Sequence, residues 1–124
     1  MSKKAIKELT RAEEEVMQVL WQIEKGFVND ILEYFPEPKP AYNTVSTIIR
    51  ILEEKQVIGH KKFGKTYQYY PLITKEEYQK SEVGDMIRNY FDNSYKKMVA
   101  YFANEEKISE EELDEILKMI KNKK

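Results

Sequence analysis

Residues 41–70 read AYNTVSTIIRILEEKQVIGHKKFGKTYQYY, and the hydrophobic period changes midway through this stretch. In the first part, apolar residues recur every three or four positions, which is typical of one face of an α-helix. After Gln56, apolar and polar residues alternate as in β-strands, and Gly64-Lys65 interrupts the alternation as a turn. The stretch therefore predicts a helix from residue 42 or 43 to about residue 55, followed by a β-hairpin over residues 57–70.

Two further helices are predicted upstream of this stretch. Thr10 and Glu13 have the spacing of a capping box, and helical periodicity continues to Lys25, after which Gly26 is the expected C-terminal stop. A second, shorter helix is predicted from Asn29 to Phe35. Three prolines then end it and stiffen the connection to the next helix, namely Pro36, Pro38 and Pro40.

Three helices followed by a basic hairpin is the element order of a winged helix-turn-helix domain. The predicted fold class is therefore mainly α. We expect a winged helix-turn-helix DNA-binding domain over residues 1–72, with the small β-hairpin as its wing, and a helical dimerisation region over residues 73–124.

The outward face of the predicted third helix carries side chains that suit base recognition. Opposite its aliphatic stripe lie Asn43, Thr47 and Arg50, where an ordinary solvated surface would be rich in Glu and Lys. Asparagine can bond adenine, and arginine can bond guanine or a phosphate. The candidate DNA-binding residues are Tyr42, Asn43, Thr44, Ser46, Thr47 and Arg50 on this helix, and Thr10, Arg11, Lys61, Lys62, Lys65 and Thr66 as phosphate contacts at the start of the first helix and on the wing.

The charge distribution favours a nucleic-acid partner for one part of the chain only. The formal net charge of −1 over 124 residues argues against such a partner when taken globally. Between Lys39 and Thr66, however, six basic and two acidic residues give a local net charge of +4, whereas the chain from Ile73 onward is net −2. A local positive band of this kind steers a protein toward phosphate.

The C-terminal part predicts three amphipathic helices without partners for their apolar stripes. Capping boxes at Thr74 with Glu77 and at Ser109 with Glu112 start two of them, and the pattern breaks around residues 92–94. Self-association would cover the exposed stripes. The predicted dimerisation residues are Tyr95, Met98, Val99, Phe102, Leu113, Ile116, Leu117 and Ile120.

Composition excludes several other classes of function. There is no cysteine and only one histidine, His60, so thiolate chemistry, zinc ribbons and most His-based sites are ruled out. His60 itself is expected to pack or to be solvated on its strand. We expect no catalytic residues, no metal site and no cofactor, hence no enzyme, and we also expect a cytoplasmic protein without membrane insertion, since no apolar run approaches the length of a bilayer span.

Several stretches of the chain resemble the bacterial penicillinase repressor family. They are Leu9-Thr10, Ala12-Glu13 and Glu15-Val16-Met17, then Ala41 to Thr47, Arg50 to Lys55 and Gly64 to Pro71. The resemblance implies a homodimeric transcriptional repressor of the antibiotic-resistance type that binds double-stranded DNA at a palindromic operator. It also implies control by a β-lactam or cell-envelope signal, through cleavage by a membrane-bound sensor metalloprotease. The family's cleaved Asn–Phe bond aligns with Tyr101–Phe102 here, where Tyr replaces Asn. Copper sensing of the kind found in one branch of the family needs cysteines that this chain lacks.

Two alternative functions remain open from the sequence alone. Winged-helix domains also serve as protein-interaction adaptors without direct DNA binding, and the acidic helical tail would then be the partner surface. A helical enzyme subunit is the third alternative, and it would need a pocket that the sequence does not indicate. A dimer without DNA affinity that co-purifies with another protein would favour the adaptor.

Overall fold

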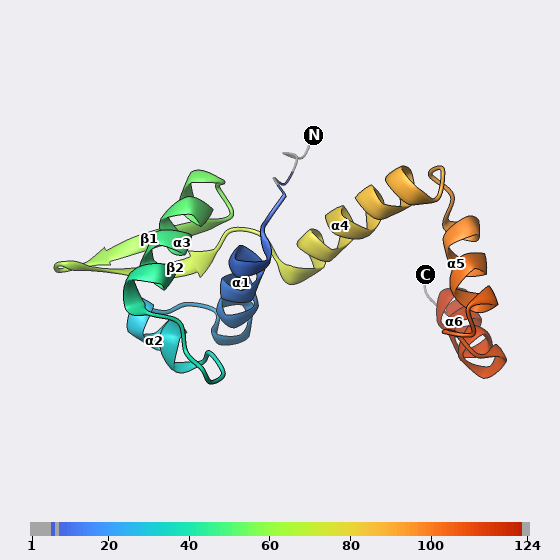
Figure 1. The fold of residues 1–124 in the computed structure, drawn as a ribbon, viewed down its shortest axis with the longest axis horizontal. Helices are drawn as coiled ribbons and strands as arrows, with labels where there is room; N and C mark the ends of the chain where they lie inside the picture. Colours follow the sequence, from blue (N-terminus) through green and yellow to red (C-terminus); the bar gives the residue numbers. More distant parts are fainter. Residues whose placement is uncertain (1–5, 7, 123–124) are drawn as a thin grey trace. The chain divides into compact units, whose positions relative to one another are not determined.

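The structure is a computed structural model that describes residue 6 and residues 8–122, with side chains up to residue 119. The chain forms two compact units, residues 1–81 and 82–124 (Figure 1). The first unit contains α1 (Arg11–Ile23), α2 (Val28–Glu33), α3 (Tyr42–Glu54), β1 (Ile58–Phe63) and β2 (Thr66–Pro71). Helix α4 (Lys75–Tyr90) starts in the first unit and ends in the second, which also contains α5 (Tyr95–Asn104) and α6 (Glu110–Asn122).

Helix α1 begins as the sequence predicts and ends earlier. Both hydrogen bonds of the capping box are present, because the Glu13 N–H donates to the Thr10 hydroxyl and the Thr10 N–H donates to the Glu13 carboxylate. The predicted stop at Gly26 is wrong. The helix ends at Ile23, Glu24 takes a positive φ of 74°, and Gly26 instead exchanges backbone hydrogen bonds of 2.9 and 2.8 Å with Tyr69 of β2.

Helix α2 is shorter at its C-terminus than the predicted segment, which ran to Phe35. It ends at Glu33, and a lysine side chain donates to carbonyls at this end in place of a further helical turn. The Lys39 ammonium donates to the carbonyls of Leu32, Glu33 and Phe35 at 3.2, 2.9 and 2.8 Å. A cation at this position also interacts favourably with the helix dipole.

The hairpin has the predicted strands and turn. The strands are antiparallel with Phe63 opposite Thr66 and Ile58 opposite Pro71, so Gly64 and Lys65 form a two-residue loop. Gly64 has a φ of +61°, which suits the first loop position of a type II′ hairpin turn. Because Gly26 pairs with Tyr69 on the free side of β2, the hairpin is attached to the segment between α1 and α2.

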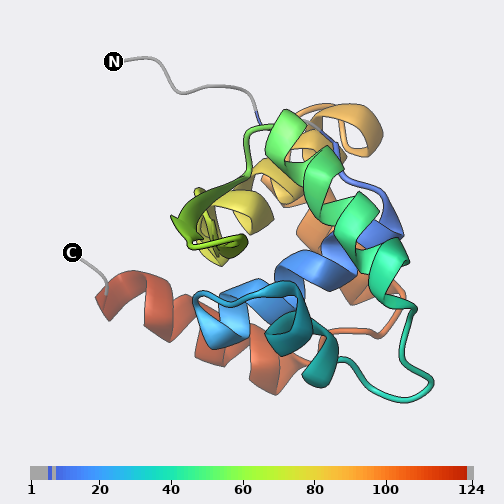
Figure 2. The same cartoon turned by 90° about the vertical axis from the view of Figure 1, so that its left-hand side faces the viewer.

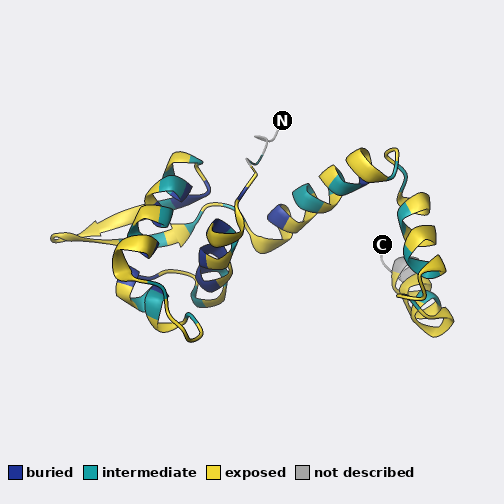
Figure 3. Ribbon diagram, viewed as in Figure 1, coloured by how far each residue is buried: buried dark blue, intermediate teal, exposed yellow. Residues whose placement is uncertain are grey.

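The hydrophobic core of the first unit lies between α1, α2, α3 and the base of the hairpin. Buried residues gather on α1 and on one side of α3 (Figure 3), where Val45, Ile49 and Leu52 are at most 1% exposed, as the aliphatic stripe predicts. Tyr78 of α4 belongs to the same core, and the Trp21 indole N–H donates to the Ile73 carbonyl at 2.9 Å. The first unit therefore continues past the hairpin into the first turns of α4.

A buried ion pair joins α1 to the end of α3. The Lys55 ammonium lies 2.6 Å from the Glu13 carboxylate and also donates to the Glu8 carbonyl at 2.9 Å. Burial on its own would raise the pKa of Glu13, but the Lys55 ammonium and the hydrogen bonds from Lys55 and Thr10 outweigh it and lower that pKa. The pair therefore holds the C-terminal end of α3 against the start of α1.

The second unit is helical, and the interruption between α4 and α5 lies where the sequence predicts it. Asp92 and Asn93 have positive φ values of 54° and 59° between α4 and α5, and Ser94 caps α5 by accepting from the Lys97 N–H. Ser109 and Glu112 form both bonds of the capping box at the start of α6. Among the described residues, none of the helices combines the length and apolarity that crossing a membrane requires.

Candidate nucleic-acid interface

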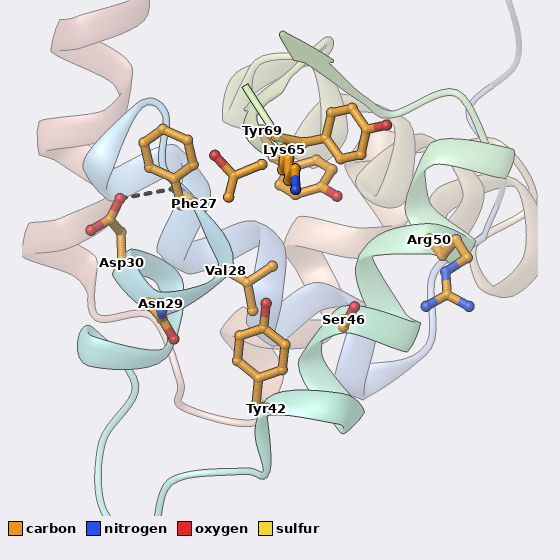
Figure 4. Close-up of a pocket in the computed structure, with 11 residues that line it drawn as sticks. Phe27, Val28, Asn29, Asp30, Tyr42, Ser46, Arg50, Lys65 and Tyr69 are labelled. Carbon is orange, nitrogen blue, oxygen red and sulfur yellow. Dashed lines mark hydrogen bonds between the residues drawn. The ribbon is translucent and has the colours of Figure 1, made fainter. Parts of the chain in front are cut away.

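An open groove of about 560 Å³ lies on the first unit between the start of α2, α3 and the hairpin. Figure 4 shows the residues that line it. They come from three elements that are separate in the sequence and are Phe27, Val28, Asn29, Asp30, Tyr42, Ser46, Arg50, Lys65, Thr66, Tyr67 and Tyr69. Its lining thus combines two cations, one carboxylate, several hydroxyl groups, an amide and aromatic rings.

The α3 side of the groove is formed by one row of side chains. Tyr42, Ser46 and Arg50 are spaced by four residues and therefore follow one another along a single face of the helix (Figure 4). The apolar stripe of the same helix is buried in the core, which fixes the rotation of α3 about its axis. Arg50 is exposed, so its guanidinium is accessible to an anion or a base edge.

The other predicted residues of α3 lie beside this row. Asn43, Thr44 and Thr47 are exposed on the helix but are not among the groove's lining residues. They therefore belong to the exposed surface of α3 outside the groove. The structure thus brings Tyr42, Ser46 and Arg50 together with the wing, and leaves the other three accessible elsewhere on the helix.

The wing contributes to the groove mainly through its turn. Lys65 and Thr66 line the groove, and the Thr66 hydroxyl donates to the Phe63 carbonyl at 2.9 Å, which closes the turn. Lys61 and Lys62 are exposed on β1 outside the lining, and the Lys61 ammonium lies 5.4 Å from the centre of the Phe63 ring. All three lysines of the wing are thus accessible to phosphate.

The two candidates at the start of α1 are not brought into the groove. The Thr10 hydroxyl accepts the capping bond from the Glu13 N–H at 3.2 Å, so one of its roles is structural. Arg11 is almost fully exposed and lies 3.9 Å from Glu15, a separation at which an exposed pair contributes little to stability. Its charge remains accessible to an anionic partner.

Sequence reasoning missed the residues that complete the groove on its α2 and β2 sides. Asn29 is exposed at the start of α2, where the Asp30 carboxylate accepts from the Phe27 N–H at 2.9 Å. Tyr69 is half-buried on the β2 side, and burial, followed by the nearby Glu53 carboxylate, raises the pKa of its hydroxyl above the ordinary value. The position of Asn29 at the start of the second helix of a helix-turn-helix was the signal that would have identified it.

His60 is exposed on β1 and its ring packs against two tyrosines, which lies within the expectation that it packs or is solvated. Its ring lies 4.5 Å from Tyr67 and 6.0 Å from Tyr69, measured between ring centroids. Its Nδ1 atom contacts the Glu53 carboxylate at the end of α3. The histidine thus links β1 to the end of α3.

The predicted dimerisation residues carry much exposed apolar surface in the second unit. On α5, Tyr95 and Val99 are exposed, and Met98 and Phe102 are half-buried. On α6, Ile116 and Leu117 are 43% and 51% exposed, Leu113 is half-buried, and the side chain of Ile120 lies outside the described residues. Tyr101, at the predicted cleavage position, is exposed within α5, and its ring contacts Phe91 and Phe102.

Comparison with known sequences identifies relatives over nearly the whole chain. A family model described as penicillinase repressor matches residues 9–122. The methicillin resistance regulatory protein MecI of Staphylococcus aureus strain N315 is 30% identical over 118 residues, covering 94% of this chain and 95% of that protein. The penicillinase repressor of Bacillus licheniformis is 24% identical over 122 residues, covering 98% and 95%.

Solved structures resemble the first unit. The solution structure of the DNA-binding domain of the repressor BlaI superposes with a TM-score of 0.52 at 27% identity, covering 61% of this chain and 94% of that domain. The monomeric form of Bacillus licheniformis BlaI in complex with the blaP half-operator gives a TM-score of 0.51 at 27% identity, with the same coverage. The predicted winged-helix fold is thereby confirmed.

Proposed function

The chain belongs to the penicillinase repressor family, and from this premise we propose that it is a transcriptional repressor that binds double-stranded operator DNA. The observation that carries the proposal is the groove between α2, α3 and the hairpin. Arg50 of α3 and Lys65 of the wing line it together with hydroxyl and amide side chains. Such a lining offers charge for phosphates together with donors and acceptors for base edges. The half-operator complex of Bacillus licheniformis BlaI, which has the same fold, supports this assignment.

In this proposal, α3 enters the major groove and the wing follows the backbone. Arg50, the exposed side chains of Asn43 and Thr47, and the half-buried Ser46 hydroxyl read base edges, with Tyr42 and Thr44 at the N-terminal end of the helix. The phosphate contacts come from the wing and from the start of α1, namely Lys61, Lys62, Lys65, Thr66, Thr10 and Arg11. Asn29 is added to this set because it lines the same groove.

The repressor acts as a homodimer in this proposal, through a dimerisation region over residues 73–124 that follows a DNA-binding domain over residues 1–72. Exposed apolar side chains on α5 and α6, among them Val99, Ile116 and Leu117, support self-association because solvent contact of this much apolar surface is unfavourable. Two-fold symmetry then requires a palindromic operator, since each DNA-binding domain contacts one half-site. Binding of this kind blocks transcription in the cytoplasm.

Inactivation by a membrane-bound sensor metalloprotease is part of the proposed function, with Tyr101–Phe102 as the cleaved bond. This bond lies inside α5, so cleavage requires that the helix open locally. Replacement of Tyr101 by Asn should increase the cleavage rate if the protease reads the residue before the bond. Incubation of both forms with membranes from β-lactam-treated cells, followed by mass spectrometry of the fragments, measures this, and equal cleavage at another bond contradicts the assignment.

Salt dependence of DNA binding tests the core of the proposal. Fluorescence anisotropy with a duplex that carries an inverted repeat from the promoter of its own gene should show affinity that falls steeply with salt. The log–log slope is about −0.9 for each phosphate neutralised. A duplex of the same composition with the repeat scrambled is the matched control. A slope near zero, or equal affinity for both duplexes at every salt concentration, contradicts sequence-specific DNA binding.

A further inference from the structure

A second groove, of about 510 Å³, lies on the first unit between the outer face of α1 and the connection from α2 to α3. The two grooves share none of their described lining residues. In both Figure 1 and Figure 2 the connection projects from the first unit on the side away from the hairpin tip. This second groove, which we call the α1 groove, is therefore separate from the groove between α2, α3 and the hairpin.

One wall of the α1 groove is apolar and stiff. It is built from Tyr34, which is 54% exposed, the half-buried Phe35 and the prolines of the connection. Prolines have a fixed φ and no N–H, so this wall presents apolar surface with few backbone donors and little freedom to rearrange. Walls of aromatic and proline side chains suit extended peptides, whose side chains project alternately into such grooves.

The opposite wall of the α1 groove is polar and belongs to α1. Glu15, Gln18 and Gln22 line it, and the glutamine amides are exposed and four residues apart. Each amide offers donors and an acceptor, which match the N–H and C=O groups of a peptide backbone. From Glu15 to Gln22 the helix rises about 10 Å, which is the length of about three residues in an extended chain.

The charge of the α1 groove is opposite to that of the groove between α2, α3 and the hairpin, where Arg50 and Lys65 outnumber Asp30. Among its described lining residues, Glu15 and Glu37 are the charged ones, and both are acidic. Arg11 lies 3.9 Å from Glu15 with both side chains exposed, which offsets little of this charge. The nearby Lys39 ammonium already donates to three carbonyls at the end of α2. Such a groove repels phosphate and attracts a cationic partner.

We propose that the α1 groove docks a short extended peptide segment of another protein, in which apolar residues are flanked by Lys or Arg. The apolar side chains pack against Tyr34, Phe35 and the prolines, and the peptide backbone bonds Gln18 and Gln22. The cationic residue lies near Glu15 or Glu37. Because the α1 groove shares no described lining residue with the groove between α2, α3 and the hairpin, a partner held there leaves that other groove accessible to DNA.

Selection from a phage library of random eight-residue peptides tests the proposal on the full-length protein. Selection on the wild-type chain is followed by removal of peptides that also bind the Glu15→Lys/Glu37→Lys variant. A Glu33→Lys/Glu76→Lys variant, which reverses two exposed acidic residues outside the groove, is the matched control. Circular dichroism melting establishes that each variant is folded.

We expect enriched peptides that carry net positive charge and apolar residues. Their affinity should fall at least tenfold in the Glu15→Lys/Glu37→Lys variant and remain within twofold in the control. Peptides without net positive charge, or binding that the groove variant retains, would overturn the proposal. So would loss of the dimer in that variant by sedimentation, because the groove's occupant would then be a second copy of this chain.

Discussion

Replacement of Glu13 by Gln should destabilise the first unit while leaving its shape intact. Glu13 is 5% exposed, accepts from the Lys55 ammonium at 2.6 Å and accepts from the Thr10 N–H at 3.0 Å. Glutamine keeps the size and one acceptor oxygen, but it removes the negative charge that compensates Lys55. The substitution therefore isolates the ion pair between α1 and the end of α3.

The magnitude follows from the surroundings of the pair. Breaking a buried ion pair costs about 3–5 kcal/mol when the remaining charge is fully buried. The Lys55 side chain is 22% exposed and keeps its bond to the Glu8 carbonyl, so water and that carbonyl recover part of this loss. We therefore expect the free energy of unfolding to fall by about 2–3 kcal/mol, a range that also fits the loss of a charged hydrogen bond.

The pH dependence identifies the ionised carboxylate as the cause. The pKa of Glu13 is lowered in the folded protein, so its carboxylate contributes stability above the unfolded-state pKa of about 4.3. That contribution is lost as the pH falls through the lowered folded-state pKa. The stability difference between wild type and Glu13→Gln should therefore be constant at neutral pH and should shrink below about pH 4.3.

Urea unfolding followed by Trp21 fluorescence measures the free energy of unfolding of the first unit, in which Glu13 lies. Trp21 is the single tryptophan of the chain, and its ring centroid lies 5.7 Å from that of Tyr78 within the first unit. Glu15→Gln, an exposed position on the same helix, is the control and should change stability by less than about 0.5 kcal/mol. Equal losses for the two variants, or a loss for Glu13→Gln that does not shrink at acid pH, would refute the reasoning.

Three further predictions concern DNA reading, packing and assembly. Arg50→Ala should lose about 1–3 kcal/mol of discrimination between an inverted-repeat duplex and its scrambled control, whereas Lys62→Ala should weaken binding to both duplexes alike. Anisotropy titrations measure both effects, and an unchanged ratio of the two affinities in Arg50→Ala excludes a base-reading role. Gly26→Val should destabilise the first unit by about 1–3 kcal/mol, because a Cβ at this position would lie 2.9 Å from the Ile23 Cδ1 atom. Unfolding monitored by Trp21 fluorescence measures this, and a variant as stable as the wild type would contradict the packing around Gly26. In sedimentation experiments, Leu117→Glu should shift the protein from dimer toward monomer, while Lys118→Glu should not. An intact dimer in Leu117→Glu places the dimer contact elsewhere on the chain.

Local sequence signals were sufficient for most of the helices and for the hairpin. Thr10 with Glu13 and Ser109 with Glu112 are three residues apart, so each capping box forms within one helical turn, independently of the rest of the chain. The Gly64-Lys65 turn likewise depends on the backbone freedom of one glycine. The sequence thus predicted the element order, the buried face of α3 and five groove residues, namely Tyr42, Ser46, Arg50, Lys65 and Thr66.

Contacts between distant residues explain what the sequence did not predict. Gly26 has the residue type of a helix stop, but it pairs with Tyr69, and glycine suits this position because a side chain there would collide with Ile23 and Asp30. Asn29 has the residue type of an ordinary helix start, and only the approach of α3 and the wing makes it part of a groove.

The sequence by itself determined which segments are helical or extended, which face of α3 is apolar and where positive charge accumulates, because each depends on residues within a few positions of one another. The tertiary structure decided which polar residues share a groove, which glutamate is buried beside Lys55 and where a second, acidic groove opens. These depend on how α1, α2, α3 and the hairpin pack. That packing is set by burial of the shared core, which has no signature at any single position of the chain.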